Sequence, residues 1–284
     1  MPATTRFAPS PTGLLHLGHA FAALFAESEA RRREGRFLLR LEDIDPGRCR
    51  REYEDPLMED LRWLGLVWEE PVLRQSERME AHRTALATLE EMGLLYPCFC
   101  SRKDIQAEIA GIGAAPQGPD GPLYPGTCRH LRPEERRWRQ ANGQPFALRL
   151  DMTRAIALAG PLYWFDAAAA TVVTAEPEGF GDVVLARKDA PVSYHLAVTV
   201  DDHHQGVTLV TRGRDLFRAT HVHRLLQALL GLRTPDYHHH DLVVDARGKR
   251  LAKRDHAPTL RSLREAGTSP DDVRTGLGFP PRQR

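Results

Sequence analysis

The fold is decided by residues 6–19, R-F-A-P-S-P-T-G-L-L-H-L-G-H. Two prolines hold the start of this stretch out of helix, and its glycines lead directly into a helical pattern. We therefore expect a strand and a turn, followed by a helix from about Leu17 to Gly35. The start of a helix favours anions, because its first amides lack partners and the helix dipole is positive there. His16 and His19, one turn apart, could donate hydrogen bonds to an anion, or could be ordinary surface or capping residues.

Length and composition set broad bounds. The 284 residues suffice for about two domains, and 39 basic against 38 acidic residues leave a net charge of +1. Composition alone therefore indicates no nucleic-acid partner, and any such contact must come from local patches. The sequence has neither a long apolar run nor the features of a signal peptide, so we expect a cytoplasmic protein without membrane contacts.

A second strand is predicted for residues 37–44, whose apolar pattern suits a buried parallel sheet. Three acids, Glu42, Asp43 and Asp45, lie at its carboxyl end, which is the edge where open α/β sheets bind ligands. We interpret Asp43 and Asp45 as salt-bridge partners of nearby arginines. Glu42 is a candidate for contact with a ligand.

Four cysteines are too few and too unevenly placed for a disulfide framework. Cys98 and Cys100 are too close in sequence to favour a disulfide with each other. Soft thiolates brought together with the distant Cys128 suit tetrahedral zinc, so the region around them is predicted to be an insertion that binds metal. The alternative is that these are three unrelated buried thiols.

Later parts of the chain predict the second half of a doubly wound sheet, because strand and helix patterns alternate again. The expected strands and helix occupy residues 182–187, 206–213, 215–230 (the helix) and 242–245. A cationic loop at 246–255 and one or two short helices, with a start at Ser269, complete the chain.

Two further segments are less informative. Residues 133–142 are predicted to form a basic helix whose Arg136, Arg137 and Arg139 could be a solvated face or could meet phosphates. No chemistry can be attached to residues 153–181.

The block at residues 6–19 resembles the HIGH signature of class I aminoacyl-tRNA synthetases, and in particular the glutamyl branch. Three later motifs resemble the same branch: L-R-L-E-D-x-D, Y-x-L-A-x-x-x-D-D-H and V-x-R-G-x-D. A short HxGH alone would be a weak signal, but the fourteen-residue block is specific. The resemblance extends over nearly all of the chain, although it covers only the catalytic half of a complete glutamyl-tRNA synthetase.

This resemblance implies a Rossmann-like, doubly wound parallel α/β sheet with a zinc-bearing insertion and no anticodon-binding domain. The implied division is residues 1–95 for the first half of the catalytic domain, 96–180 for the insertion, 181–240 for the second half, and 241–284 for a KMSKS-like loop and C-terminal helices.

The resemblance also implies roles for individual residues. The implied catalytic residues are His16, His19 and Lys253. The implied glutamate pocket contains Arg6, Phe7, Ala8, Pro9, Ser10, Glu42, Tyr194 and Arg212. The implied ATP site, which takes ATP with Mg²⁺, contains His16, Gly18, His19, Arg250 and Lys253.

Within the glutamate pocket, the resemblance places Glu42 against the substrate's α-ammonium. An arginine such as Arg212 can hold a carboxylate through two parallel hydrogen bonds, which would select glutamate over glutamine. Three positions depart from the family's pattern. Val198 stands where some glutamyl enzymes have an asparagine, Arg250 replaces the first lysine of KMSKS, and Ala252 replaces its serine.

For the metal, resemblance to the glutamyl-Q tRNA(Asp) branch of the family implies one structural zinc bound by Cys98, Cys100, Tyr124 and Cys128. A phenolate is an uncommon zinc ligand, and His130 could compete with Tyr124 for the remaining position.

The function expected from this branch is ATP-dependent activation of L-glutamate and its transfer to the queuosine base of tRNA(Asp), by a monomer that docks on the anticodon stem-loop. One alternative is the catalytic part of a split glutamyl-tRNA synthetase that charges the 3′ end. Another is a non-catalytic sensor of glutamate or nucleotide, which the change at Ala252 would favour.

Overall fold

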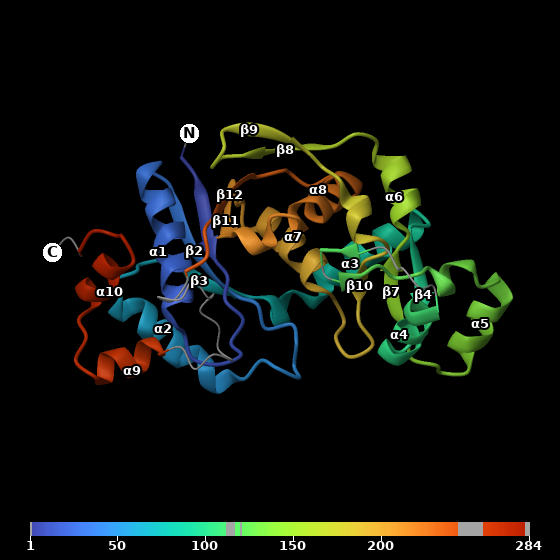
Figure 1. Ribbon diagram of the computed structural model, residues 1–284, viewed down its shortest axis with the longest axis horizontal. Coiled ribbons are helices and arrows are strands. Elements are labelled where there is room, and N and C mark those ends of the chain that lie inside the picture. The colour runs from blue at the N-terminus through green and yellow to red at the C-terminus, as the bar shows by residue number, and fades with distance from the viewer. Residues whose placement is uncertain (1, 112–116, 120, 244–257, 282–284) are drawn as a thin grey trace.

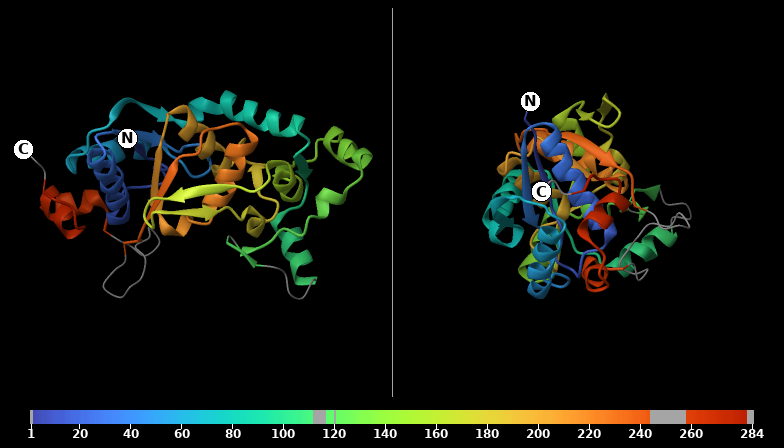
Figure 2. Two further views of the ribbon diagram at one scale, coloured as in Figure 1. Left: turned by 90° about the horizontal axis from the view of Figure 1, so that it is seen from above. Right: turned by 90° about the vertical axis from the view of Figure 1, so that its left-hand side faces the viewer.

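The computed structural model describes residues 2–111, 117–119, 121–243 and 258–281 of the chain (Figure 1). The molecule is elongated, with the C-terminal helices at one end and the segment around β4, β7 and α5 at the other (Figure 2). The main sheet lies between these ends.

The main sheet consists of two parallel halves that meet at β1 and β11. The first half has the order β1-β2-β3, with β1 at Thr4–Phe7, β2 at Arg36–Leu41 and β3 at Glu69–Arg74. The second half has the order β11-β12-β8-β9, with β11 at Leu209–Gly213, β12 at Asp236–His240, β8 at Tyr163–Asp166 and the antiparallel β9 at Thr171–Thr174. The backbone N–H of Thr208 donates to the carbonyl of Thr4 at 3.0 Å and joins the halves. The predicted α/β fold with a parallel sheet is confirmed, and β9 is an antiparallel strand at the edge of the second half.

Helices cover the sheet and enclose two apolar cores. Around the first half of the sheet lie α1 (Leu17–Arg32) and α2 (Glu54–Trp63), whose core includes Leu24, Leu39 and Leu61. Around the second half lie α3 (Met79–Glu91), α7 (Tyr194–His204) and α8 (Ala219–Leu229). Short 3-10 turns precede several helices, at Arg51–Tyr53 (η1), Gln75–Arg78 (η2), Thr127–His130 (η3), Pro177–Phe180 (η4) and Arg214–Leu216 (η5).

Helix α1 begins at Leu17, as the sequence predicts, and its return into β2 depends on Gly35. The N–H of Arg36 donates to the carbonyl of Ala3 at 2.9 Å. A Cβ atom at residue 35 would lie 1.9 Å from that same carbonyl oxygen, so only glycine allows the turn to approach β1 this closely. The turn thereby sets the register between β1 and β2.

A separate antiparallel sheet lies at the far end of the molecule, with the order β10-β7-β4. Its strands are β4 (Leu95–Cys98), β7 (Ala147–Leu150) and β10 (Val184–Ala186). Around it lie α4 (Arg102–Gly111), α5 (Pro133–Ala141), α6 (Met152–Ala159) and the hairpin of β5 (Gln117–Gly118) and β6 (Gly121–Pro122).

The structure differs from two expectations about strands. The insertion expected at residues 96–180 includes β8 and β9, which lie in the main sheet because β8 pairs with β12. The strand expected at residues 242–245 is wrong for Leu242 and Val243, which lie outside any strand; residues 244 and 245 fall outside the described residues. The strand of this region is β12, whose three histidines hide its buried character from a hydropathy pattern.

The C-terminal helices α9 (Leu260–Glu265) and α10 (Pro270–Gly276) pack back on the first half of the sheet. The N–H of Leu260 donates to the carbonyl of Leu15 at 2.8 Å. Ser269 caps α10, as expected from the sequence. The cationic loop predicted at residues 246–255 lies outside the described residues.

Asp60, on α2, is a buried carboxylate at this contact. Its side chain is fully buried, and neither carboxylate oxygen has a hydrogen-bond partner. Burial raises the pKa of Asp60 to about 6, although Arg264 of α9, 3.9 Å away, opposes the shift. Arg264 makes a closer ion pair, at 3.1 Å, with the exposed Glu59.

We predict that Asp60→Asn stabilises the protein at pH 8 but not at pH 4. Because the folded-state pKa of about 6 exceeds the unfolded value of 3.8, the wild type loses stability as pH rises between these values. The variant should escape a penalty of roughly 3 kcal/mol at pH 8. Urea unfolding at both pH values measures it, with Glu80→Gln, at an exposed carboxylate of α3, as the control. An equal effect of Asp60→Asn on stability at pH 4 and pH 8 would contradict the raised pKa of Asp60.

Candidate active site

Three cavities lie at the carboxyl ends of the sheet strands, where the two halves of the sheet meet. The α1 cavity, of about 530 Å³, lies at the start of α1 and is lined by Phe7, Ala8, Pro9, His16, Gly18 and His19, among others. The Glu42 cavity, of about 340 Å³, is lined by Glu42, Gln75, Ser193 and Tyr194, among others. The large cavity, of about 1020 Å³, lies between η5, the tip of the β8–β9 hairpin and the β5–β6 hairpin. Doubly wound sheets bind ligands at this edge.

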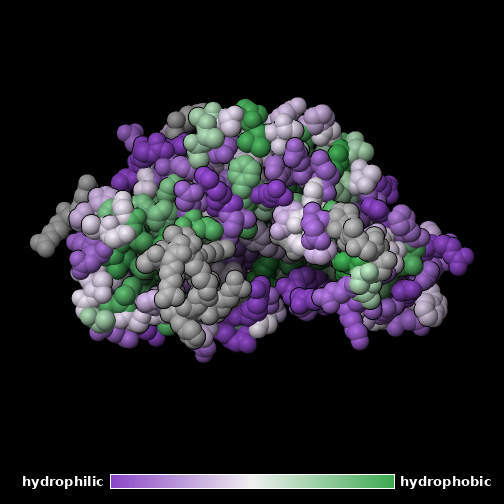
Figure 3. All heavy atoms as spheres, viewed as in Figure 1, coloured by the Kyte–Doolittle hydropathy of each residue, from purple (hydrophilic) through white to green (hydrophobic). Residues whose placement is uncertain are grey.

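The cavities are contiguous, because each pair shares lining residues. Ser10 and Thr12 line both the α1 cavity and the Glu42 cavity. Tyr194 and His195 line both the Glu42 cavity and the large cavity. The α1 cavity and the large cavity share two residues of η5, Asp215 and Leu216. Figure 3 shows the molecule hollowed near the middle of the face it presents. One site can therefore hold three ligand groups side by side.

The start of α1 presents two histidines of fixed tautomer. The Nδ1 of His16 accepts from the backbone N–H of Gly18 at 3.1 Å, and the Nδ1 of His19 accepts from the N–H of His16 at 3.2 Å. Because a backbone N–H can only donate, the proton of each neutral ring must lie on Nε2. The rings lie 3.9 Å apart, and a Cβ at residue 18 would come within 3.0 Å of the His16 ring. Glycine at position 18 therefore lets the histidines cap the helix and present donors.

Charged side chains at the ends of β1 and β2 form a buried network. Asp202, on α7, accepts from the Nε of Arg6 at 2.8 Å and from the Nη1 of Arg40 at 2.7 Å. Arg40, which is fully buried, also donates to Glu42 at 3.1 Å. Burial raises the pKa of Glu42, and the charge of Arg40 opposes that shift. The network holds Glu42 in the cavity wall, while Arg6 lies behind it with its guanidinium bonded to Asp202 and to the carbonyl of Thr211.

Arg212, at the end of β11, is a buried cation of a different kind. Its guanidinium bonds to neutral groups: the hydroxyl of Thr220 at 2.6 Å, the Nδ1 of His223 at 3.0 Å, the Nε2 of His239 at 3.3 Å and the hydroxyl of Tyr194 at 3.5 Å. Within the described ranges, no carboxylate lies within ion-pair distance of it. A buried charge is normally paired, so Arg212 is suited to receive an anionic group from a ligand.

The imidazoles around Arg212 stay neutral. Burial, followed by the nearby Arg212 charge, lowers the pKa of His239 to about 2 and that of His195 to about 4. The pKa of His223 is also lowered well below its usual value, for the same two reasons. The positive charge of Arg212 is therefore neither shared with nor neutralised by its neighbours.

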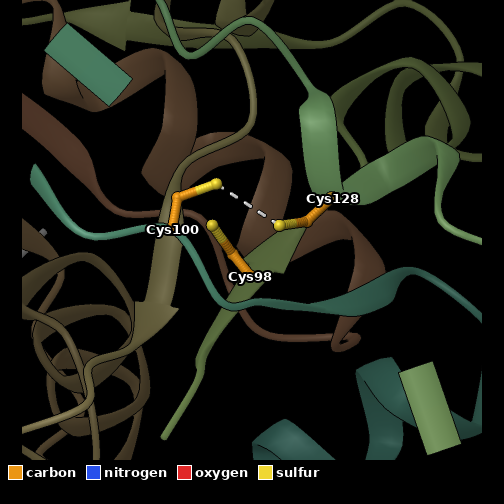
Figure 4. Close-up of side chains that lie close together, drawn as sticks. All are labelled: Cys98, Cys100 and Cys128. Carbon is orange, nitrogen blue, oxygen red and sulfur yellow. Dashed lines mark hydrogen bonds between the residues drawn. The ribbon is translucent and has the colours of Figure 1, made fainter. Parts of the chain in front are cut away.

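The cysteines predicted to bind metal lie close together at the end of β4 and in η3. The Sγ atoms of Cys98, Cys100 and Cys128 all lie within 4.8 Å of one another and point toward a common centre (Figure 4). The Tyr124 hydroxyl lies 3.4 Å from the Sγ of Cys98 and 3.6 Å from that of Cys100. Ligand atoms of a tetrahedral zinc with Zn–S bonds of about 2.3 Å lie about 3.8 Å apart, so the four groups fit zinc.

The protonation of the cysteine cluster and the identity of its fourth ligand bear on metal binding. The neighbouring Cys98 thiol, followed by other hydrogen-bond donors around it, lowers the pKa of Cys128, which favours the thiolate form that binds zinc. Burial raises the pKa of Tyr124, whereas the Arg149 guanidinium, 3.8 Å from its ring centre, offers a positive charge nearby. His130 is exposed and does not belong to the cluster.

Some of the expected site residues lie elsewhere than the sequence suggested. Phe7, Ala8 and Pro9 line the α1 cavity instead of the Glu42 cavity, and Ser10 lines both. Arg250 and Lys253, expected at the ATP site, lie outside the described residues.

Sequence reasoning missed much of the wall of the large cavity. Asp166, Ala168, Ala169 and Phe180 come from residues 153–181, to which no chemistry had been attached. No local motif marks them, because only the pairing of β8 with β12 brings this segment to the site. The quoted motif Y-x-L-A, in contrast, contains His195.

The basic helix α5 is mostly engaged in local contacts. Arg136 donates to the carbonyl of Arg129, and Arg139 pairs with Glu135 at 2.6 Å. Arg137 remains exposed and pairs with Glu134 at 3.4 Å. Of these arginines, Arg137 is best placed to meet an external phosphate.

Residues 2–278 match the family described as tRNA synthetases class I (E and Q), catalytic domain. The chain belongs to this family. The match explains why the HxGH block, the doubly wound sheet and the three adjoining cavities occur together. In the described part of the chain, no helix combines the length and apolar character needed to cross a bilayer.

Curated relatives divide into two groups within the class I family. The Glutamyl-Q tRNA(Asp) synthetase of Rhodobacter capsulatus is 52% identical over 97% of this chain and 99% of its own length. The Glutamate–tRNA ligase of Aquifex aeolicus is 38% identical over 94% of this chain, but that alignment spans only 54% of the relative.

A solved structure shows the same catalytic fold. The glutamate tRNA ligase from Elizabethkingia meningosepticum, crystallised in complex with its amino acid, superposes with a TM-score of 0.74 at 29% identity. The alignment covers 90% of this chain and 52% of the ligase, so this chain spans about half of that protein.

Proposed function

We propose that this chain activates L-glutamate with ATP to give glutamyl-adenylate, and then transfers the glutamyl group to queuosine in the anticodon of tRNA(Asp). The observation that carries the proposal is the buried Arg212, whose bonded partners are all neutral. A substrate with a side-chain carboxylate would supply the missing negative charge. The Glutamyl-Q tRNA(Asp) synthetase of Rhodobacter capsulatus, which aligns over 99% of its length, supports the choice of acceptor.

Glutamate would lie in the Glu42 cavity. Its α-ammonium would face Glu42, which lines the cavity, and its side-chain carboxylate would approach Arg212. Arg212 itself lines none of the three cavities and reaches the wall of this one through the Tyr194 hydroxyl, 3.5 Å away. Both charges of the substrate would thus meet buried charges of opposite sign. Glutamine, which lacks the second carboxylate, would leave Arg212 without a counter-charge.

ATP, entering as its Mg²⁺ complex, would lie in the α1 cavity. The first amides of α1 and the Nε2–H groups of His16 and His19 would donate to its phosphates. Arg250 and Lys253 would add positive charge from the KMSKS-like loop. Ser10 and Thr12, shared by the α1 and Glu42 cavities, mark where the glutamate α-carboxylate would reach the α-phosphorus.

The chemistry needs no covalent intermediate with the enzyme. The α-carboxylate of glutamate attacks the α-phosphorus of ATP, and pyrophosphate leaves. The chain's contribution is to position the two reactants and to stabilise the phosphate charge. A hydroxyl of the acceptor, lying in the large cavity, then attacks the activated carbonyl. The volume of about 1020 Å³ accommodates a nucleoside beside the glutamate.

The choice between acceptors is the finer part of the proposal. Glutamate–tRNA ligases, which this chain also resembles, favour the alternative of charging the 3′ end. Queuosine carries a cyclopentenediol, whose adjacent hydroxyls resemble those of a terminal ribose, so the same site could serve either acceptor. We propose docking on the anticodon stem-loop by a monomer, with Arg137 of α5 available for a phosphate contact.

We further propose that Cys98, Cys100, Cys128 and Tyr124 hold one structural zinc. Zinc there would join β4 to η3, which also meet at Asp182, because Tyr96 of β4 and Arg129 of η3 both donate to its carboxylate. The cluster contributes no residue to the three cavities. Its role would therefore be to stabilise the structure at the far end of the molecule, and it would take no part in glutamate activation.

The first prediction concerns Arg212 and tests activation. Arg212→Ala should reduce glutamate-dependent exchange of pyrophosphate into ATP, assayed without tRNA, by about thirty-fold or more, because an unpaired buried carboxylate costs roughly 2–5 kcal/mol. Arg212→Lys should recover only part of this loss, and Arg83→Ala, at an exposed pair on α3, is the control. A loss below about threefold, or equal wild-type exchange with glutamine, would refute the glutamate pocket.

The second prediction concerns the metal. Elemental analysis of purified protein should find close to one zinc per chain, and Cys100→Ser should lose it because a hydroxyl is a poor zinc ligand. Cys49→Ser is the matched control, since Cys49 lies outside the cluster. Exchange activity should survive the loss of zinc better than transfer to tRNA does. Retention of zinc by Cys100→Ser would exclude this ligand set.

The third prediction concerns the acceptor. Labelled glutamate is offered with tRNA(Asp) in three forms: with queuosine, without queuosine, and with queuosine but without the 3′ terminus. The proposal requires label on the first and third forms only. Label on the queuosine-free form would favour the split-synthetase alternative, and a wild type that neither exchanges nor transfers would favour the sensor.

A further inference from the structure

A chain of hydrogen bonds leads from Arg212 to the boundary between two cavities. The Nη1 of Arg212 lies 3.0 Å from the Nδ1 of His223, and the Nε2 of His223 lies 3.1 Å from the Nδ1 of His195. His195 lines both the Glu42 cavity and the large cavity. Neither His223 nor His195 has a role in the activation step described above.

The direction of this chain is fixed by chemistry. A guanidinium can only donate, so the Nδ1 of His223 accepts and the proton of the neutral ring lies on its Nε2. That Nε2–H must donate to the Nδ1 of His195, which places the proton of His195 on Nε2 as well. Burial and the Arg212 charge lower the pKa of both rings, which supports their neutral form. His195 is therefore a hydrogen-bond donor, not an acceptor, at the nitrogen away from His223.

The position of the His195 Nε2–H group limits which ligand atoms it can contact. Its ring is held between Phe180 and Tyr194, with ring centres 6.0 and 5.7 Å away, so its orientation is set by packing as well as by His223. Of the three junctions between cavities, His195 lies at the one between the cavities assigned to glutamate and to the acceptor. A neutral donor there is suited to an oxygen that must be oriented without being charged, such as a hydroxyl.

We propose that His195 binds the acceptor by donating a hydrogen bond from Nε2 to an oxygen of its diol, and so orients the attacking hydroxyl. This inference rests on the proposed function and concerns its second step. In that step the hydroxyl oxygen bonds to the glutamyl carbonyl carbon, the bond from that carbon to the phosphate oxygen breaks, and the hydroxyl proton passes to the departing AMP. Because Nε2 carries a proton, His195 does not act as the base.

The test compares three substitutions at one position. In His195→Gln, the amide nitrogen can occupy the position of Nε2 and keep a donor at the cavity. In His195→Asn, the shorter amide reaches only the position of Nδ1, and His195→Phe keeps the ring shape without a donor. For each, transfer to queuosine-containing tRNA(Asp) and pyrophosphate exchange without tRNA are measured on the same preparation.

We expect the ratio of transfer to exchange to fall at least about tenfold in His195→Asn and His195→Phe, mainly through the KM for tRNA, and less than about threefold in His195→Gln. His204→Asn, at an exposed histidine of the same helix, is the control and should keep the wild-type ratio. Pyrophosphate exchange also shows whether a variant is folded. If one donor-free variant loses both exchange and transfer, the comparison uses the other donor-free variant.

An unchanged ratio in both donor-free variants, or an equal fall in His195→Gln, would overturn the inference while leaving the proposed function intact. Failure of the wild type to exchange or to transfer would instead overturn the proposed function. If the wild type labels the 3′ terminus, the same ratios measured on that acceptor decide the role of His195, because a terminal ribose also presents a diol.

Discussion

The ion pairs of Asp202 hold the two halves of this structure together. One carboxylate on α7 accepts from Arg6 on β1 and from Arg40 on β2, so a helix of the second half is tied to two of the three strands of the first. Both arginines are buried, and Arg40 is completely so. Removing Asp202 alone would leave these cations buried without their shared partner, and a broken buried pair costs roughly 3–5 kcal/mol.

The residue before it, Asp201, accepts hydrogen bonds on a different side of α7. It accepts from Gln75 at 3.0 Å, from Arg78 at 3.2 Å and from His82 at 3.0 Å, all of which come from η2 and α3. Consecutive residues of a helix point about 100° apart, so two adjacent carboxylates can satisfy two separate sets of donors. This explains the physical need for two successive acids in the motif Y-x-L-A-x-x-x-D-D-H.

Charge balance also separates structural residues from candidate site residues. Arg6 and Arg40 are compensated by Asp202, and Glu42 shares Arg40. Among the described residues, the buried Arg212 hydrogen-bonds only to hydroxyls and neutral imidazoles, and its guanidinium lies 5.3 Å from the centre of the Tyr237 ring. The sequence pattern does not distinguish these arginines, because each lies at or near the end of a strand. They differ only in the charges that surround them in the folded structure.

The sequence by itself determined the local units: the strand–turn–helix at residues 6–19, the start of α1, the cap at Ser269 and the grouping of Cys98 with Cys100. These depend on proline, glycine and capping chemistry, or on spacing within a few residues, and so are visible in a short window. The tertiary structure alone decided that β8 joins the main sheet, that Arg6 lies behind the cavity wall and that Arg212 finds no acidic partner among the described residues. Strand pairing and charge pairing join residues far apart in the chain, and no local pattern records which partner a buried group finds.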